Sequence, residues 1–155
     1  MIVLDINYHS PIKLETYIWS AKLNKPIPVI LLYDTGASGL SLSKSFLSEH
    51  GFELKGKMRV DTANNRVLSD KYLIPDFWIL GEDFGDVEAT ACSIYGLDDL
   101  KKYGLKELES PGYDGLIGMK YIRGFNTEFD FDGNKITFIA RKDYIAECIS
   151  KVKDY

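Results

Sequence analysis

Three consecutive residues, Asp34, Thr35 and Gly36, are the clearest candidates for chemistry in the sequence. A carboxylate can act as a general acid or base, a short hydroxyl can pin the loop that carries it, and a glycine lets the backbone approach the carboxylate closely. The apolar segment Val29 to Tyr33 precedes them, and further apolar residues follow. The acid is therefore expected on a loop between two core strands, where its position can be fixed rigidly.

One carboxylate is not enough to hydrolyse a peptide bond in this way. The reaction needs a base that activates water and an acid that protonates the carbonyl oxygen, and two close carboxylates sharing one proton supply both. The chain has no second Asp-Thr-Gly or Asp-Ser-Gly, and Asp61 is followed by Thr62 and Ala63, so the glycine is missing there. A two-fold dimer sets identical residues face to face. The sequence therefore predicts a homodimer in which Asp34 meets Asp34 of the partner subunit.

The rest of the chain predicts a mainly β fold that positions this loop. Strand-forming segments are rich in β-branched and aromatic residues and are separated by turn signals. They are Ile2 to Tyr8, Leu14 to Ala21, Ile27 to Tyr33, Met58 to Val60, Val67 to Ile74, Phe77 to Leu80, Val87 to Tyr95, Thr127 to Phe131 and Ile136 to Ile139. No repeat or low-complexity linker divides residues 1–155, so we expect a single domain.

Two or three short helices are expected among the strands. Ser43 is a suitable N-cap for a helix that ends before Gly51, a residue typical of a helix C-terminus. Met119 to Arg123 forms a second helical segment, and the apolar spacing in Asp143 to Val152 predicts a terminal helix.

A polar hairpin tip lies between two apolar arms. It consists of Thr62, Ala63, Asn64, Asn65 and Arg66, and the Asn pair tolerates the positive φ angles of a tight turn.

Other prominent residues receive structural interpretations. Asp114, which also precedes a glycine, is interpreted as a turn or capping carboxylate rather than a catalytic one. Trp19 and Trp78 are expected in the core or at the base of the hairpin whose tip is residues 62–66, because large aromatic residues dominate burial in small β domains.

Composition excludes several function classes. The net charge is −4 and no block of Lys or Arg is present, which disfavours nucleic acid as a partner. The longest apolar run, Ile27 to Tyr33, is far shorter than a membrane span, and no secretory signal precedes it, so we expect no membrane association and a cytoplasmic location. Two cysteines and two histidines make a zinc site improbable. No metal and no cofactor are expected.

Three motifs in order resemble the retropepsin-like aspartic peptidases. The segment from Asp34 to Ser38 is similar to the active-site loop of that family, Asp61 to Arg66 to its flap, and Leu116 to Gly118, with the helix beyond, to its hydrophobic-hydrophobic-Gly segment. The resemblance covers nearly the whole chain. It implies a closed, β-barrel-like acid protease fold and a homodimer with one active site that cleaves polypeptides.

The same resemblance assigns roles to individual residues. Asp34, Thr35 and Gly36 are the implied catalytic residues, with Thr35 hydrogen-bonded across the dimer axis. Ala37 is an implied substrate contact, as are the flap residues Thr62, Ala63, Asn64 and Asn65. Because Ala37 stands where pepsin-like enzymes usually carry Ser, the resemblance also implies a pH optimum less acidic than pepsin's.

Two departures and two alternatives stay open. The flap tip lacks the glycines of viral flaps, and the C-terminal segment looks helical, whereas viral dimers interleave terminal strands. The main alternative is a catalytically silent module of the same fold that dimerises or binds peptides. The other is a domain cut from, or acting as, a self-processing precursor.

Overall fold

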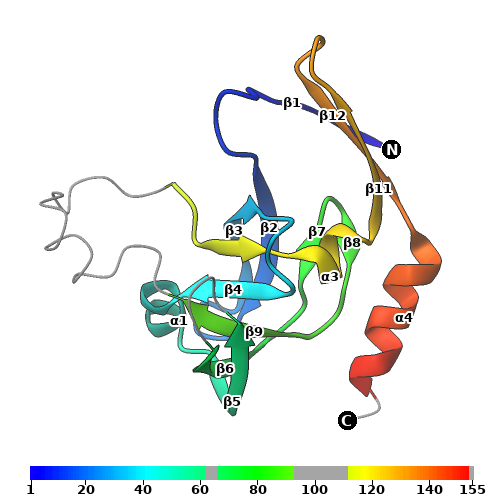
Figure 1. The fold of residues 1–155 in the computed structure, drawn as a ribbon. Helices are drawn as coiled ribbons and strands as arrows, with labels where there is room; N and C mark the ends of the chain where they lie inside the picture. Colours follow the sequence, from blue (N-terminus) through cyan, green and yellow to red (C-terminus); the bar gives the residue numbers. More distant parts are fainter. Residues whose placement is uncertain (62–65, 93–111, 154–155) are drawn as a thin grey trace, which may run out of the picture.

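The computed structural model describes residues 1–61, 66–92 and 112–153. The strands are β1 (Ile2–Asp5), β2 (Lys13–Ser20), β3 (Lys25–Tyr33), β4 (Leu40–Ser43), β5 (Glu53–Asp61), β6 (Arg66–Ile74), β7 (Trp78–Ile79), β8 (Glu82–Asp83), β9 (Val87–Cys92), β10 (Gly115–Ile117), β11 (Phe125–Asp130) and β12 (Lys135–Ala140). The helices are α1 (Lys44–His50), α3 (Met119–Ile122) and α4 (Lys142–Lys153). The expected mainly β fold is confirmed (Figure 1).

The strands form two open sheets, so the expected closed barrel is wrong. The larger sheet has nine strands in the order β5-β6-β9-β4-β10-β3-β2-β7-β8, and the smaller has the order β1-β12-β11. Closure would require β5 to pair with β8. Because β8 has only two residues, it offers too few backbone groups to form a ladder with the nine-residue β5.

The short strand β10 occupies the centre of the larger sheet. It runs parallel to the end of β3 and antiparallel to β4, with Leu31 opposite Gly115 on one side and Leu42 on the other. Because β10 comes from the last third of the chain, this insertion brings residues 112–118 next to the loop that joins β3 to β4. The loop with Asp34 is thereby placed at the middle of the sheet.

Local sequence signals explain the helices. Ser43 caps α1 by accepting a hydrogen bond from the Phe46 N–H at 3.1 Å, and Gly51 ends the helix with a φ of 65°. The helix expected at Met119 is confirmed as α3, and the terminal helix is confirmed as α4. Among the described helices, none is both long enough and apolar enough to cross a bilayer.

One core joins the sheet to the helices. On β2, buried Leu14, Thr16 and Ile18 alternate with residues that face outward, and the Thr16 hydroxyl donates to the Val29 carbonyl at 2.8 Å. Burying each such aliphatic side chain stabilises the fold by about 1.5–3 kcal/mol. The expectation that the tryptophans are core or flap-base residues is wrong for Trp78, which is 39% exposed on β7, at the opposite end of the strand order from β5 and β6.

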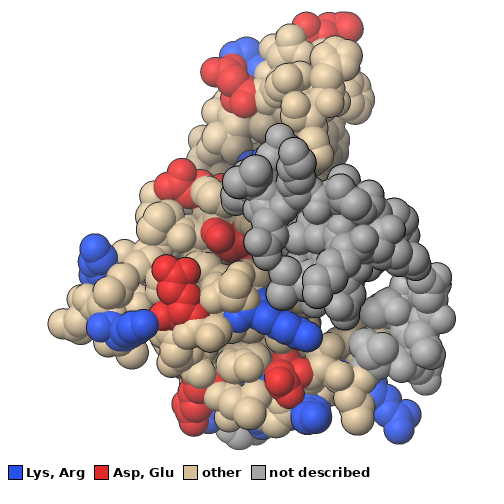
Figure 2. Space-filling model, turned by 90° about the vertical axis from the view of Figure 1, so that its left-hand side faces the viewer, with Lys and Arg blue, Asp and Glu red and all other residues tan. Residues whose placement is uncertain are grey.

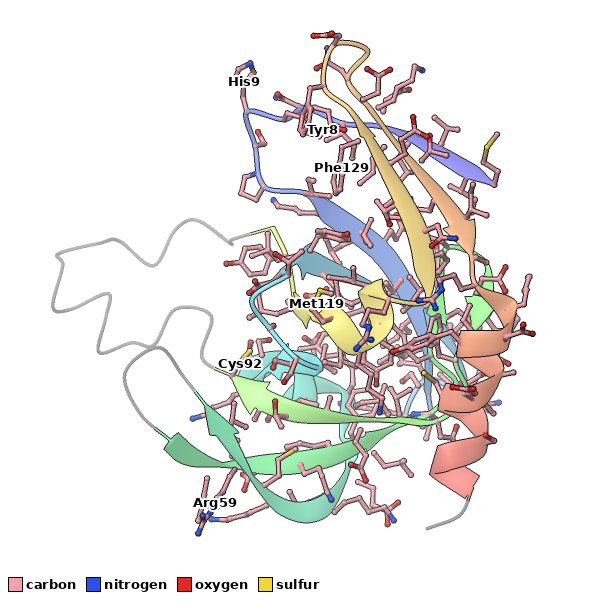
Figure 3. All side chains as sticks on the ribbon, turned by 45° about the vertical axis from the view of Figure 1, so that its right-hand side comes forward. Tyr8, His9, Arg59, Cys92, Met119 and Phe129 are labelled. Atoms are coloured by element: carbon pink, nitrogen blue, oxygen red, sulfur yellow. The ribbon has the colours of Figure 1, made fainter. Side chains whose placement is uncertain are left out.

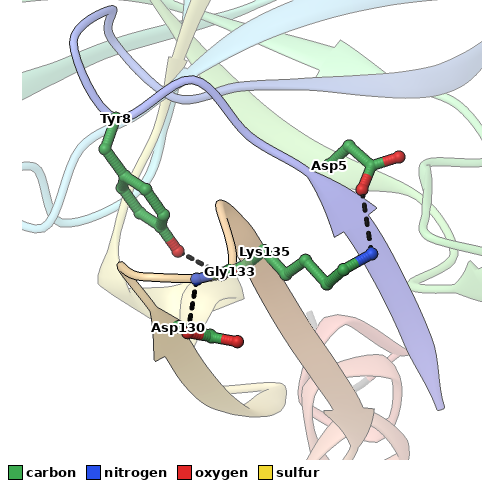
Figure 4. A network of polar contacts seen from close by, with 5 residues as sticks. All are labelled: Asp5, Tyr8, Asp130, Gly133 and Lys135. Atoms are coloured by element: carbon green, nitrogen blue, oxygen red, sulfur yellow. Dashed lines mark hydrogen bonds and ion pairs between the residues drawn. The ribbon is translucent and has the colours of Figure 1, made fainter.

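The smaller sheet projects from the rest of the molecule as an arm (Figure 1). Its strands β11 and β12 were expected, and the turn that joins them is fixed by the Gly133 N–H, which donates to Asp130 Oδ1 at 2.8 Å. Lys135 forms an ion pair with Asp5 at 3.1 Å, and its carbonyl accepts a hydrogen bond from the Tyr8 hydroxyl (Figure 4). These contacts hold β1 and the segment after it against the hairpin.

Candidate active site

Asp34 lies at the first position after β3, where the sheet still holds its backbone. The Asp34 N–H donates to the Ile117 carbonyl at 3.0 Å, which extends the pairing of β3 with β10 by one step. Its carboxylate accepts a hydrogen bond from the Gly36 N–H at 2.9 Å. The Asp34 side chain is half-buried, while Thr35 and Gly36 are exposed. The carboxylate is therefore oriented by the loop and remains accessible.

The loop of residues 34–39 is supported by the start of α3. The N–H groups of Gly118, Met119 and Lys120 donate to the carbonyls of Gly39, Ala37 and Ser38 at 2.8, 2.9 and 2.9 Å. A Cβ atom at Gly118 would lie 2.6 Å from the Ala37 carbonyl oxygen, so only glycine permits this approach. The Leu116 to Gly118 segment thus acts as the floor of the Asp34 loop.

Asp114 performs a structural task beside this floor. Its carboxylate accepts from the Ile30 N–H at 3.0 Å, while its own N–H donates to the Ile30 carbonyl at 2.6 Å. Its carbonyl accepts from the Ser43 N–H at 2.8 Å. Asp114 therefore clamps β3 and β4 together at the entry of β10, a structural contact between distant strands rather than the turn or cap that its sequence suggested.

The predicted site residues are brought together in part. Asp34, Thr35, Gly36 and Ala37 share one loop. The flap residues Thr62, Ala63, Asn64 and Asn65 lie outside the described residues. The arms of the predicted hairpin are confirmed, because β5 and β6 pair antiparallel as far as Asp61 opposite Arg66.

An aromatic chain leads from the candidate site to the arm, and the sequence did not reveal it. Tyr33, next to Asp34, packs edge-on against Phe129 with ring centroids 6.4 Å apart. Phe129 stacks on Phe131 at 6.1 Å, and Phe131 contacts Tyr8 at 4.8 Å. Tyr8 and Phe129 lie between the hairpin and the segment that follows β1 (Figure 3). The only sequence signal was the alternation in the segment Thr127 to Phe131, which includes Phe129 and Phe131.

Burial keeps the Tyr33 hydroxyl neutral. It raises the pKa of Tyr33 above its usual value, and a hydrogen bond with Thr127 opposes this effect. A phenol whose pKa is raised stays protonated throughout the neutral range. Tyr33 therefore adds no charge beside Asp34.

The described residues offer no metal cluster, and Cys92 is a poor nucleophile. Burial raises the pKa of the Cys92 thiol to about 11, although nearby Lys44 opposes the shift. A thiol with that pKa is a poor nucleophile at neutral pH, because the thiolate is the reactive form. No group of three or more His, Cys, Asp or Glu residues in the described ranges is arranged to hold a metal ion. The expectation that the site needs no metal stays a prediction.

We expect Cys92 to alkylate about 100-fold more slowly in the folded protein than in the unfolded chain at pH 8, because raising the thiol pKa from 9.0 to about 11 lowers the thiolate fraction by that factor. Iodoacetamide labelling of a Cys148→Ser variant, with and without denaturant, measures the ratio. Equal rates in the two states would show that burial does not protect this thiol.

Comparison with known proteins agrees with this geometry. Residues 19–121 match the family model described as aspartyl protease, which is well over half of the chain. No curated protein sequence gives a significant match.

One solved structure shows the same fold. The chain is similar to a retropepsin-like aspartic protease from Rickettsia conorii, with a TM-score of 0.55, 20% identity and 88% of each chain covered. Matches also include the retroviral protease-like domain of Ddi1 from Leishmania major, at a TM-score of 0.41, 13% identity and coverage of 86% of this chain and 98% of that one. The EIAV protease matches at 0.43 and 14% identity, covering 68% of this chain and 100% of that one. The matched family model, on a fold shared with the Rickettsia enzyme, shows that the chain belongs to the aspartyl protease family.

Proposed function

We propose that the protein is an aspartic endopeptidase that acts as a homodimer, with Asp34 as the catalytic residue of each subunit. The observation that carries the proposal is the position of the Asp34 carboxylate. The carboxylate is accessible at the end of a central strand and is oriented by the Gly36 N–H. Its loop is held by three backbone hydrogen bonds from residues 118–120. Such support is what a carboxylate needs to act on a bound water with defined geometry.

The chemistry follows from pairing two such carboxylates. One ionised Asp34 removes a proton from a water that attacks the peptide carbonyl, while the protonated Asp34 of the partner subunit donates its proton to the carbonyl oxygen. Thr35 and Gly36 hold the loop. Ala37 and the hairpin tip at residues 61–66, with Thr62, Ala63, Asn64 and Asn65, contact the polypeptide substrate.

The arm supplies a suitable surface for the second subunit. Two aromatic residues at one end of the arm are exposed: Phe131, in the turn after β11, is 68% exposed, and Phe129, on β11, is 39% exposed. Exposed aromatic clusters of this kind mark interaction surfaces. The aromatic chain begins at Tyr33, next to Asp34. A second subunit that binds to this chain therefore lies close to the two-fold axis of the dimer, on which the two Asp34 residues must meet.

The Phe131→Lys variant is expected to weaken the dimer about 100-fold, because it places a charge in the centre of this aromatic surface. Sedimentation equilibrium measures the dissociation constant, and peptidase activity should recover at high protein concentration. The control is Leu54→Lys, at an apolar residue that is 56% exposed on β5, and it should leave the dimer intact. An unchanged dimer in the Phe131 variant would exclude the arm as the interface.

The activity itself is tested with the wild-type protein. Cleavage of unfolded proteins or a peptide library, blocked by a statine-type transition-state analogue, is the expected result. Inactivity across roughly pH 3 to 8, which spans the ionisation of a carboxylate pair, would instead favour a silent dimerisation or peptide-binding module. A profile with its optimum as acidic as that of pepsin would contradict the role inferred for Ala37.

The proposal includes a cytoplasmic location and no nucleic-acid or membrane partner. Both cysteines are free, as is usual in a reducing compartment. Figure 2 shows basic and acidic residues interspersed on the face in view, without the uniform positive field that phosphate backbones attract.

A further inference from the structure

A concave site away from the Asp34 loop lies on the side of β2 that faces away from the core. This aromatic pocket has a volume of about 310 Å³ and is lined by Tyr17, Ile18, Trp19, Pro26, Asp76, Trp78 and Gly81. Its volume falls within the range of sites that bind small groups. Both tryptophans of the chain line it, and Tyr17 and Trp78 are 43% and 39% exposed.

The register of three strands builds the platform of this pocket. Tyr17 on β2 stands opposite Trp78 on β7 and opposite Pro28 on β3, while Trp19 stands opposite Pro26. Proline is tolerated in β3 because β10 pairs only with Leu31 to Tyr33, so that within the described ranges no strand pairs with the first part of β3 on that side. The platform therefore rests on fixed backbone rather than on a loop.

Hydrogen bonds fix the indole of Trp78. Its Nε1–H donates to Asp76 Oδ1 at 3.0 Å, and the Asp76 N–H donates to Asp86 Oδ1 at 3.0 Å. Asp76 has a φ of 52°, a left-handed conformation that Asp adopts more readily than most residues. The ring and the carboxylate are thus held side by side before any ligand arrives.

We propose that the aromatic pocket binds an arginine side chain of a polypeptide. Aromatic faces attract a guanidinium group by cation–π stacking, and tryptophan does so most strongly. Three acidic residues lie in or next to the pocket: Asp76 lines it, Asp83 pairs with Trp78 in the ladder, and Glu15 accepts a hydrogen bond from the Tyr17 hydroxyl. The basic residue next to Pro26 in the sequence is Lys25, so negative charge exceeds positive charge among these neighbours. The rest of the wall is apolar and matches the aliphatic stem of arginine.

The aromatic pocket is separate from the candidate active site. Pro26 and Tyr33 lie at opposite ends of β3, seven residues apart, which corresponds to roughly 23 Å along a strand. Binding at the pocket therefore leaves the Asp34 loop free, and it does not depend on the proposed peptidase activity.

The test uses tryptophan emission, which reports on this pocket alone because both tryptophans line it. The full chain carrying Asp34→Asn, which prevents cleavage, is titrated with the peptide Ala-Pro-Arg-Pro-Ala and with the same peptide containing neutral citrulline instead of arginine. We expect a saturable change in emission and about tenfold tighter binding of the arginine peptide.

Asp76→Asn is the decisive variant, since asparagine keeps an acceptor for the Trp78 indole and tolerates the left-handed backbone. It should reduce the preference for arginine over citrulline to about twofold or less. Asp132→Asn, in the turn of the arm, is the matched control and should keep the preference. Circular dichroism checks that each variant is folded. Equal affinities of the two peptides for the parent protein, or an unaltered preference in Asp76→Asn, would overturn the proposal.

Discussion

Asp34→Asn is expected to lower kcat/KM by about 10³-fold or more while leaving the fold and the dimer intact, because it removes a group that exchanges protons with water and substrate. The asparagine oxygen can still accept the hydrogen bond that the Gly36 N–H donates to Asp34 Oδ1. The loop therefore keeps its shape when the acid is lost. Steady-state peptide cleavage, circular dichroism and sedimentation measure the three properties separately.

Asp114→Asn provides the matched control for this substitution. Asp114 also precedes a glycine, but its carboxylate accepts a hydrogen bond from the Ile30 N–H. Replacing the charged acceptor by a neutral one should cost about 1 kcal/mol of unfolding free energy and leave kcat per folded dimer within about threefold of wild type. If both variants lost activity to the same extent, Asp34 would have no special role.

Mixing the two kinds of subunit tests whether Asp34 works as half of a pair. When wild-type and Asp34→Asn subunits exchange at equal concentrations, about one quarter of the dimers carry two wild-type subunits. Activity should fall to about that fraction if each active site needs both carboxylates. A fall to one half would show that each subunit acts alone.

The sequence was informative where a feature is local. The cap at Ser43 and the left-handed Gly51 each depend on residues within one or two turns, and both are found as expected. The place of Asp34 on a loop directly after a strand was also predicted, because a short motif after an apolar segment carries its own context. The same locality explains why the arms of the Asp61–Arg66 hairpin could be placed.

Features that depend on distant pairing were missed. The clamp between Asp114 and Ile30 joins residues 84 positions apart, and the contact of Tyr33 with Phe129 crosses from the sheet to the arm. The prediction of a closed barrel was wrong for the same reason. Closure would require the two edge strands, β5 and β8, to pair with each other, and no single segment of the sequence reveals whether they do. The exposure of Trp78 follows from its position near the edge of the sheet, which its residue type does not reveal.

Gly118, which lies against the loop of Asp34, is the position of the second substitution with a large expected effect. Gly118→Ala should lower the unfolding free energy by about 3 kcal/mol, because the new Cβ meets three backbone atoms of the loop at 2.6–2.7 Å and the backbone must move to relieve the contact. For a domain of this size that corresponds to a fall in Tm of about 6–12 °C. Thermal unfolding followed by circular dichroism measures it.

The same change should reduce kcat/KM of the folded fraction by about 100-fold, since the hydrogen bonds from Gly118, Met119 and Lys120 set the position of the loop and hence of Asp34. Gly39→Ala is the control, because it makes the same substitution in the loop itself, where an added Cβ has no atom within 4 Å. It should alter the unfolding free energy by about 0.5 kcal/mol or less. Similar losses in the two variants would mean that general stiffening of the loop, rather than the close approach at Gly118, controls the site. A loss confined to Gly118 would show that the floor built by β10 and α3 is what holds the acid in place.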